Sequence, residues 1–208
     1  EKDLVSAKCV KTIRTEGGRV EVEVELGFPA VGYRDTLSAA LRDRLAALPG
    51  VGEVVIRVES RIIAHEVQKG LKPLPGVKNI IAVASGKGGV GKSTTAVNLA
   101  LALSAEGATV GLLDADIYGP SQPRMLGASE RPESRDGKTM EPIVSHGIQS
   151  MSIGYLIEEE TPMVWRGPMV TQALEQLLRD TRWQNLDYLV IDLPPGTGDT
   201  QLTLAQKV

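Results

Sequence analysis

Apolar and charged residues alternate strictly near the start of the chain. Between Arg19 and Leu26, every second position is valine or leucine, and the positions between them are glutamate. This period of two predicts a β-strand with one buried face and one solvated face. Gly17-Gly18 marks a turn before it, so residues 9–14 are its expected antiparallel partner.

Leucines at helical spacing follow this strand. They predict a helix over residues 36–48, capped by Asp35 and stopped by the Pro-Gly pair that follows. Residues 51–63 return to a strand pattern. We therefore expect residues 1–65 to form a small α+β domain of order ββαβ, and the proline- and glycine-rich residues 66–78 to form a linker.

Uninterrupted apolar runs replace the alternation over residues 79–208. Three of them have strand length and are separated by helical patterns; the runs cover residues 79–84, 109–114 and 186–192, and the clearest helices cover residues 93–106 and 170–179. Wholly apolar strands that alternate with helices are typical of a parallel sheet covered on both faces. The expected fold class is α/β with a mostly parallel sheet.

The loop after the first apolar run carries a phosphate-binding pattern. Gly86, four further residues and then Gly91-Lys92-Ser93 satisfy G-x-x-x-x-G-K-[ST], in which backbone N–H groups wrap phosphates at a helix N-terminus. Only residues without a Cβ let the backbone turn tightly enough to aim several amides at one ligand. Lys92 supplies charge and Ser93 supplies a hydroxyl for Mg²⁺. The alternative, a glycine-rich turn without a ligand, does not account for the strand before the loop and the helix after it.

Acidic residues follow the two later runs. Asp114 and Asp116 follow one run, and Asp192 ends the other after four apolar residues, as in a Walker B motif. Because ligands bind at the carboxyl ends of parallel strands, these carboxylates are expected on the edge that holds the phosphate loop. Helix capping is the alternative role for Asp114 and Asp116.

The loop after Asp192 is stiff and punctuated by glycine. Residues 193–199 read Leu-Pro-Pro-Gly-Thr-Gly-Asp, and Gly196 lets an amide approach a terminal phosphate. We interpret the loop as a γ-phosphate sensor, with an ordinary turn as the alternative.

Composition limits the classes of function. The 208 residues are 42% hydrophobic with a formal net charge of −3, as in an ordinary globular protein. This charge does not indicate a nucleic-acid partner. No apolar run reaches the roughly 18 residues that cross a bilayer, and no leader-like segment opens the chain. We therefore expect a cytoplasmic protein without nucleic-acid or membrane partners.

Two features of the N-terminal region invite a metal-site interpretation that we do not favour. Cys9 is the single cysteine, so this chain alone cannot complete a thiolate cluster site, and we interpret it as a small buried hydrophobe. The face of Glu21, Glu23 and Glu25 is interpreted as solvated sheet surface.

The ends of the chain suggest that it is a piece of a longer protein. Its first residue is Glu rather than Met, and Val208 follows an apolar run without a stop signal. We expect the sheet to be incomplete at its C-terminal side. An incomplete domain of this kind is expected to dissolve poorly and to bind nucleotide weakly without turnover.

The loop and acidic motifs together resemble one family. Lys87 is the extra lysine of the deviant Walker A group, which includes MinD, ParA and the nitrogenase iron protein. Three further segments are similar to those of the Mrp/ApbC iron–sulfur cluster carrier ATPases, namely residues 114–121, 164–168 and 192–199. Residues 1–65 resemble the iron–sulfur assembly domain that is fused to many Mrp proteins.

The resemblance implies a homodimer that binds ATP with Mg²⁺, hydrolyses it, and holds a transferable [4Fe–4S] cluster between its subunits for delivery to apo iron–sulfur proteins. It assigns the nucleotide contacts to Gly86, Lys87, Gly88, Gly89, Val90, Gly91, Lys92, Ser93, Thr94 and Gly196. It assigns catalysis to Lys92, Asp116 and a Lys87 that reaches the nucleotide of the partner subunit. It assigns the Mg²⁺ site to Ser93, Asp114 and Asp192.

Two departures from the family pattern concern the cluster. The family's cluster-binding Cys-x-x-Cys lies beyond the Walker B region, in a C-terminal stretch that this chain lacks, so its ligands are absent here. In the small domain, Val31 follows Pro29-Ala30 where related domains often have a cysteine, so no cluster is expected at that position.

A second hypothesis is an ATP-dependent positioning or partitioning switch like MinD or ParA. It predicts an amphipathic C-terminal helix or a basic DNA-binding face. The run Tyr118-Gly-Pro and the N-terminal domain favour the carrier over the switch.

Overall fold

The chain divides into two compact units, residues 1–63 and residues 64–208, which we call the N-terminal and C-terminal units. The computed structural model describes residues 2–65, 73–157 and 167–196. Most of the predicted linker, most of the run Val164–Pro168 and the end of the loop after Asp192 lie outside these ranges.

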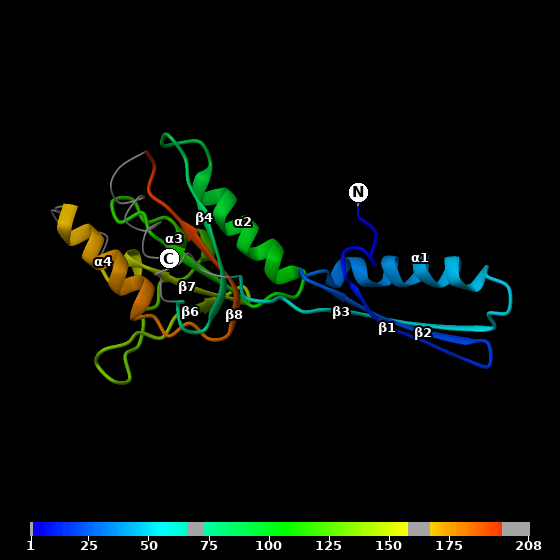
Figure 1. The fold of residues 1–208 in the computed structure, drawn as a ribbon. Helices are drawn as coiled ribbons and strands as arrows, with labels where there is room; N and C mark the ends of the chain where they lie inside the picture. Colours follow the sequence, from blue (N-terminus) through cyan, green and yellow to red (C-terminus); the bar gives the residue numbers. More distant parts are fainter. Residues whose placement is uncertain (1, 66–72, 158–166, 197–208) are drawn as a thin grey trace. The chain divides into compact units, whose positions relative to one another are not determined.

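The N-terminal unit is a three-stranded sheet with one helix across it (Figure 1). The sheet order is β1-β2-β3, with β2 antiparallel to β1 and parallel to β3. A short 3₁₀ turn, η1, precedes α1, the helix that connects β2 to β3. The bounds are β1 Val10–Glu16, β2 Arg19–Leu26, η1 Val31–Tyr33, α1 Arg34–Ala46 and β3 Glu53–Ser60. The order ββαβ is the predicted one.

The alternation along β2 separates its two faces. Its apolar side chains are buried in a cluster that includes Leu37 of α1. The glutamates lie on the other face, where Glu21 and Glu23 pair with Arg57 of β3, and Glu25 pairs with Lys11 of β1 and with Arg61 just after β3. This face is therefore a set of cross-strand ion pairs, each exposed enough to contribute little to stability.

The predicted bounds of α1 were wrong at both ends. The helix begins at Arg34 with Tyr33 as its N-cap, and no side chain makes a capping hydrogen bond. Asp35 lies in the first turn, where a carboxylate favours the positive end of the helix dipole without capping it. Leu48 lies beyond the last turn and is 52% exposed, so it does not belong to the apolar side of the helix.

The C-terminal unit is built on a five-stranded sheet of order β4-β8-β5-β7-β6. The first four strands are parallel, and β6 runs antiparallel to β7 as a hairpin at the edge. The strands are β4 Val77–Val83, β5 Val110–Asp114, β6 Ile143–Ser145, β7 Ile148–Ser152 and β8 Leu186–Asp192. The predicted α/β class with a mostly parallel sheet is confirmed.

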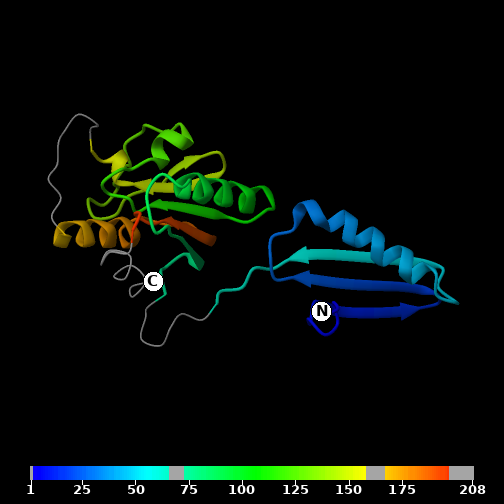
Figure 2. The same ribbon diagram turned by 90° about the horizontal axis from the view of Figure 1, so that it is seen from above.

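Helices cover both faces of this sheet (Figure 2). Leu113, Leu189 and Ile191 share one buried cluster with the apolar side of α4. The alternate residues Leu112 and Val190 are also fully buried and point to the opposite face, where α2 packs on β5 and β8. The helical elements are α2 Lys92–Ala105, α3 Gln122–Leu126, η2 Ile153–Tyr155 and α4 Gly167–Arg179. Within the described ranges, no helix has the length and apolar character needed to cross a bilayer.

Candidate functional site

The predicted phosphate loop connects β4 to α2 as an open turn. Gly89 and Gly91 have φ of 71° and 83°, in the left-handed region that favours glycine, and Gly91 is the N-cap of α2. No side chain caps this helix start, so its first N–H groups lack the side-chain acceptor that usually satisfies them. A Cβ built on Gly86, Gly88, Gly89 or Gly91 would meet no atom within 4 Å. The loop is therefore an uncapped, open set of amides, as anion binding requires.

Strand pairing brings the two strand-end acids together. In the register of the sheet, Asp192 of β8 lies beside Asp114 of β5 on one side and beside Val83, the last residue of β4, on the other. Both carboxylates are fully buried. Ser152 of β7 is the next neighbour of Asp114. The two acids thus lie side by side at one edge of the sheet, and Asp192 is next to the strand from which the phosphate loop begins.

Asp192 is held by two side-chain donors. Lys92 Nζ, at the start of α2, forms a buried ion pair with Asp192 Oδ1 and also donates to Ser93 Oγ at 3.1 Å. Gln122 Nε2, from α3, donates to Asp192 Oδ2 at 2.8 Å. Lys92 therefore contacts two other residues expected at the site, Ser93 and Asp192.

Asp114 organises the loop between β5 and α3. Its Oδ2 accepts hydrogen bonds from the backbone N–H groups of Ser121 (2.9 Å) and Gln122 (3.0 Å) and from the Ser152 hydroxyl (3.2 Å), and its Oδ1 accepts from the N–H of Asp116 (3.1 Å). Because four hydrogen bonds tie its two oxygens to residues 116–122 and to Ser152, this carboxylate fixes the path of the loop.

Asp116 and Lys87 are the more accessible residues of the predicted site. Asp116 accepts a 3.3 Å hydrogen bond from the N–H of Gly119 and is partly exposed. Partial burial raises the pKa of Asp116, and the nearby charge of Lys92 opposes this shift. The side chain of Lys87 is exposed in the phosphate loop, and so is Thr94 in the first turn of α2.

Gly196 joins the loop after β8 to the phosphate loop. It has φ of 101°, and its N–H donates to the carbonyl oxygen of Ser85 at 2.9 Å. In this conformation the amide expected to face a terminal phosphate is engaged by the backbone at the start of the phosphate loop.

Burial raises the pKa of Asp114 to about 6, and the charge of Asp192 contributes to the rise. The folded C-terminal unit therefore binds a proton more readily than the unfolded chain. The resulting stabilisation is fully present below pH 3.8, the ordinary pKa, and is lost as the pH rises through about 6.

We expect the free energy of unfolding to fall by about 2 kcal/mol from this group between pH 4 and pH 7. Asp114→Asn removes this component, because the amide does not titrate. The measurement is urea unfolding in EDTA across this range, with Asp136→Asn as control, since backbone hydrogen bonds lower the pKa of the exposed Asp136 to about 2, below the range. Equal pH slopes for the wild type and Asp114→Asn would contradict the assignment.

The donor set of the site fits Mg²⁺. The available atoms are oxygens of Ser93 and Asp192, and Mg²⁺ in proteins is usually held by one or two carboxylates together with phosphates and water. The buried Gln122 Oε1 has no hydrogen-bond partner among the described residues, so it is an acceptor for a donor brought in with a hydrated ion. Among the described residues, no group of three or more His, Cys, Asp or Glu side chains forms a self-sufficient metal site.

Two residues of the site were not predicted from the sequence. Gln122 binds Asp192 and Ser152 binds Asp114, but neither belongs to a motif of ligand-binding residues. Ser152 could have been found only from the pairing of β5 with β7, and Gln122 only from the path of the loop that Asp114 holds.

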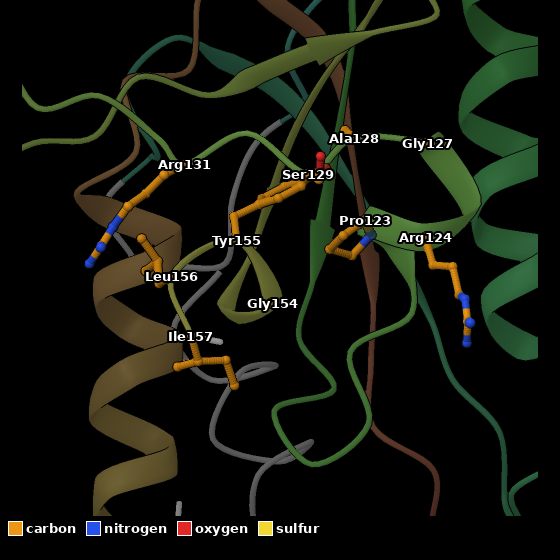
Figure 3. A pocket seen from close by; sticks show the side chains of 10 residues that line it. All are labelled: Pro123, Arg124, Gly127, Ala128, Ser129, Arg131, Gly154, Tyr155, Leu156 and Ile157. Carbon is orange, nitrogen blue, oxygen red and sulfur yellow. The ribbon is translucent and has the colours of Figure 1, made fainter. Parts of the chain in front are cut away.

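A separate cavity of about 580 Å³ lies beside α3 (Figure 3). Pro123 and Tyr155 form part of its wall, and Arg124 and Arg131 lie at its two sides. None of the residues predicted for the phosphate site lines it, so the cavity is distinct from the phosphate loop.

Two family models match the chain. The model described as the NUBPL iron-transfer P-loop NTPase, of the ParA group, matches residues 76–208. The model described as an iron–sulfur cluster assembly protein matches residues 1–56. The two matches fall in the C-terminal and N-terminal units respectively.

Individual proteins show the same similarity over much of the chain. The iron–sulfur cluster carrier protein of Pseudomonas fragi is 59% identical over 81% of this chain and 59% of its own length. The iron–sulfur cluster transfer protein NUBPL of Mus musculus is 47% identical over 87% of this chain and 60% of its own length. The chain thus spans about three fifths of these relatives.

A solved structure also resembles the chain. It is a nucleotide-binding protein of Archaeoglobus fulgidus in complex with ADP, 40% identical in sequence, with a TM-score of 0.55. The match covers 64% of this chain and 51% of that protein.

Proposed function

Because the chain belongs to the family of NUBPL-type iron-transfer P-loop NTPases, we propose that the protein binds and hydrolyses ATP while it assembles iron–sulfur clusters and transfers them to apo-proteins. The relatives whose names carry this activity are longer than the chain. The proposal therefore concerns the intact protein, with the C-terminal unit as the larger part of its ATPase domain.

The contact of Lys92 with Ser93 and Asp192 beside the open glycine loop is the observation that carries the proposal. In the proposed site, amides of residues 86–91 surround the phosphates, and Thr94 lies near the α-phosphate. Lys92 moves from Asp192 to the β- and γ-phosphates, which leaves Ser93 and Asp192 to hold Mg²⁺. Asp114 supports the Mg²⁺ shell from behind by fixing the adjacent loop.

Phosphoryl transfer depends mainly on positioning and on neutralising charge. Bound Mg²⁺ would supply Lewis-acid stabilisation of the phosphate oxygens. Asp116 is proposed to orient the attacking water and to accept its proton. Its raised pKa suits this role, because a carboxylate with a pKa closer to neutrality is a stronger base.

Two features support coupling of hydrolysis to a conformational change. The exposed Lys87 can extend toward the nucleotide of a second subunit. We therefore propose a homodimer in which each subunit completes the other's site, and we propose that it is cytoplasmic. The bond from Gly196 N–H to the Ser85 carbonyl must open before this amide faces a γ-phosphate. The loop after β8 is therefore proposed to have two states that report on ATP.

The iron–sulfur cluster is the cargo in this proposal. Four iron sites need several thiolates, and Cys9 is the one cysteine of the chain. Its Sγ donates weakly to the carbonyl of Ala7 at 3.8 Å. The cluster ligands are therefore assigned to the part of the intact protein that the relatives have and this chain lacks.

The test is a transfer assay with the intact protein. After reconstitution with iron and sulfide, we expect visible absorbance of a cluster, recovery of activity when an apo iron–sulfur enzyme is added, and ATP hydrolysis that Asp116→Asn reduces at least about 100-fold. Cluster absorbance without transfer to the acceptor would contradict the carrier function. ATP-driven binding to liposomes or DNA without transfer would favour a MinD- or ParA-like switch instead.

A further inference from the structure

Gln122 joins the three elements of the site. It is the first residue of α3 and is only 1% exposed. Its side-chain Nε2 donates to Asp192 Oδ2 of β8 at 2.8 Å and to the carbonyl oxygen of Ser93 in α2 at 3.1 Å. Its backbone N–H donates to Asp114 Oδ2 of β5 at 3.0 Å. One residue thus contacts both strand-end acids and the helix that follows the phosphate loop.

The chemistry of the neighbours determines how the amide is turned. Both groups that face Nε2 are oxygens, a carboxylate and a carbonyl, and neither has a proton to donate. An amide turned the other way would place Oε1 against these two acceptors. Gln122 therefore presents its NH₂ to Asp192 and Ser93, and its Oε1 on the other side.

Among the residues that the structure describes, the buried Oε1 of Gln122 has no hydrogen-bond partner. An unsatisfied buried acceptor costs about 1–3 kcal/mol. The Oγ of the adjacent Ser121 is buried and unpartnered as well. Because the Gln122 side chain already contacts Asp192 and Ser93, a ligand at this site can supply a donor for Oε1, and the water shell of Mg²⁺ is such a donor.

We propose that Gln122 is a positioning residue for the Mg²⁺–nucleotide site: its NH₂ holds Asp192 in the orientation that binds the ion, and its Oε1 accepts a hydrogen bond from the hydrated ion. This inference depends on the nucleotide site proposed above. When Lys92 moves from Asp192 to the phosphates, Gln122 is the remaining side-chain donor that the structure gives to Asp192. The carboxylate then keeps its orientation because Gln122 ties it to the Ser93 carbonyl of α2.

The test measures how strongly Mg²⁺ and nucleotide binding are coupled in the intact protein. ADP affinity is measured by calorimetry with Mg²⁺ and with EDTA, and the ratio of the two dissociation constants is the readout. Gln122→Met keeps the length and the burial but removes both polar atoms. Gln122→Glu keeps the shape and places a second carboxylate against Asp192. Gln149→Met is the control. The side chain of Gln149, near the start of β7, also makes two hydrogen bonds, to the backbone N–H and carbonyl of Gln184 just before β8.

For Gln122→Met we expect the Mg²⁺ enhancement of ADP affinity to fall about 10- to 100-fold, the usual cost of removing a residue that orients a metal ligand. ADP affinity in EDTA should stay within about threefold of wild type, since amides of the phosphate loop are unchanged. Gln149→Met should match wild type in both conditions. If Gln122→Met does not fold, Gln122→Glu provides the same comparison and is expected to lose at least as much coupling.

Two results would overturn the inference. One is a Gln122 variant whose ratio of ADP dissociation constants equals that of the wild type. The other is a loss of ADP affinity that is equal with and without Mg²⁺, which would show a purely structural role. If the proposed function is wrong, the wild-type protein itself binds no ADP with Mg²⁺ or with EDTA. That outcome also overturns the inference about Gln122.

Discussion

Replacing Lys92 with alanine is expected to weaken ATP binding by the intact protein about 100-fold, the loss of a charge-assisted contact worth roughly 2–3 kcal/mol. The side chain of Lys92 is 7% exposed and already lies in the site, in contact with Ser93 and Asp192. Its ammonium therefore needs only to exchange a carboxylate for phosphate oxygens. Calorimetry with ATP and Mg²⁺ measures the change.

The same substitution has a second effect when no nucleotide is bound. It leaves the fully buried Asp192 carboxylate without its cation, and breaking a buried ion pair on one side costs about 3–5 kcal/mol. Lys78→Ala is the matched control, because the Lys78–Asp187 pair is 45% exposed at its lysine and should contribute less than about 1 kcal/mol.

Two measurements of Lys92→Ala separate these effects. Urea unfolding without ligand reports the ion pair, and ATP affinity reports the phosphate contact. Adding Asp192→Asn to Lys92→Ala should restore part of the lost stability, since it removes the uncompensated charge, but it should not restore ATP binding. Unchanged ATP affinity in Lys92→Ala would refute the proposed nucleotide site.

Gly76→Ala is expected to reduce the free energy of unfolding of the C-terminal unit by about 2–5 kcal/mol. Gly76 has φ of 76°, and its carbonyl accepts a 2.7 Å hydrogen bond from the N–H of Leu186, where β8 begins beside β4. A Cβ there would overlap the carbonyl oxygen of Trp183 and lie 3.3 Å from its carbonyl carbon. The backbone at Gly76, just before β4, must therefore move away from the backbone at Trp183, which precedes β8.

Gly137→Ala isolates the backbone part of this effect. Gly137 also has a left-handed φ, of 68°, but a Cβ there would meet nothing within 4 Å. We expect it to cost only about 1–2 kcal/mol, the penalty for an L-residue in this conformation. Thermal or urea unfolding of the two variants gives the comparison. Equal losses would show that Gly76 is required for its dihedral angle alone.

Local patterns were enough to locate the three strands of the N-terminal unit, the strands β4, β5 and β8 and the phosphate loop, but not the edge hairpin of β6 and β7. The alternation in Arg19–Leu26 and the apolar run before Asp192 each record how a segment is buried, and burial depends on the residues of that segment. The ends of α1 were predicted less well. Its start is set by the preceding 3₁₀ turn at Val31–Tyr33 rather than by a capping side chain, and such a turn has no distinct residue signal.

The amino-acid sequence by itself determined that glycines and a lysine stand between a strand and a helix, and that aspartates end two apolar strands, because these are short-range patterns. Only the tertiary structure decided that Asp114 lies beside Asp192, that Lys92 pairs with Asp192, and that Gln122 binds both acids. Asp192 is 100 positions from Lys92 and 70 positions from Gln122 in the sequence. These contacts arise from the strand order of the sheet and the path of its loops, which the packing of the whole unit sets.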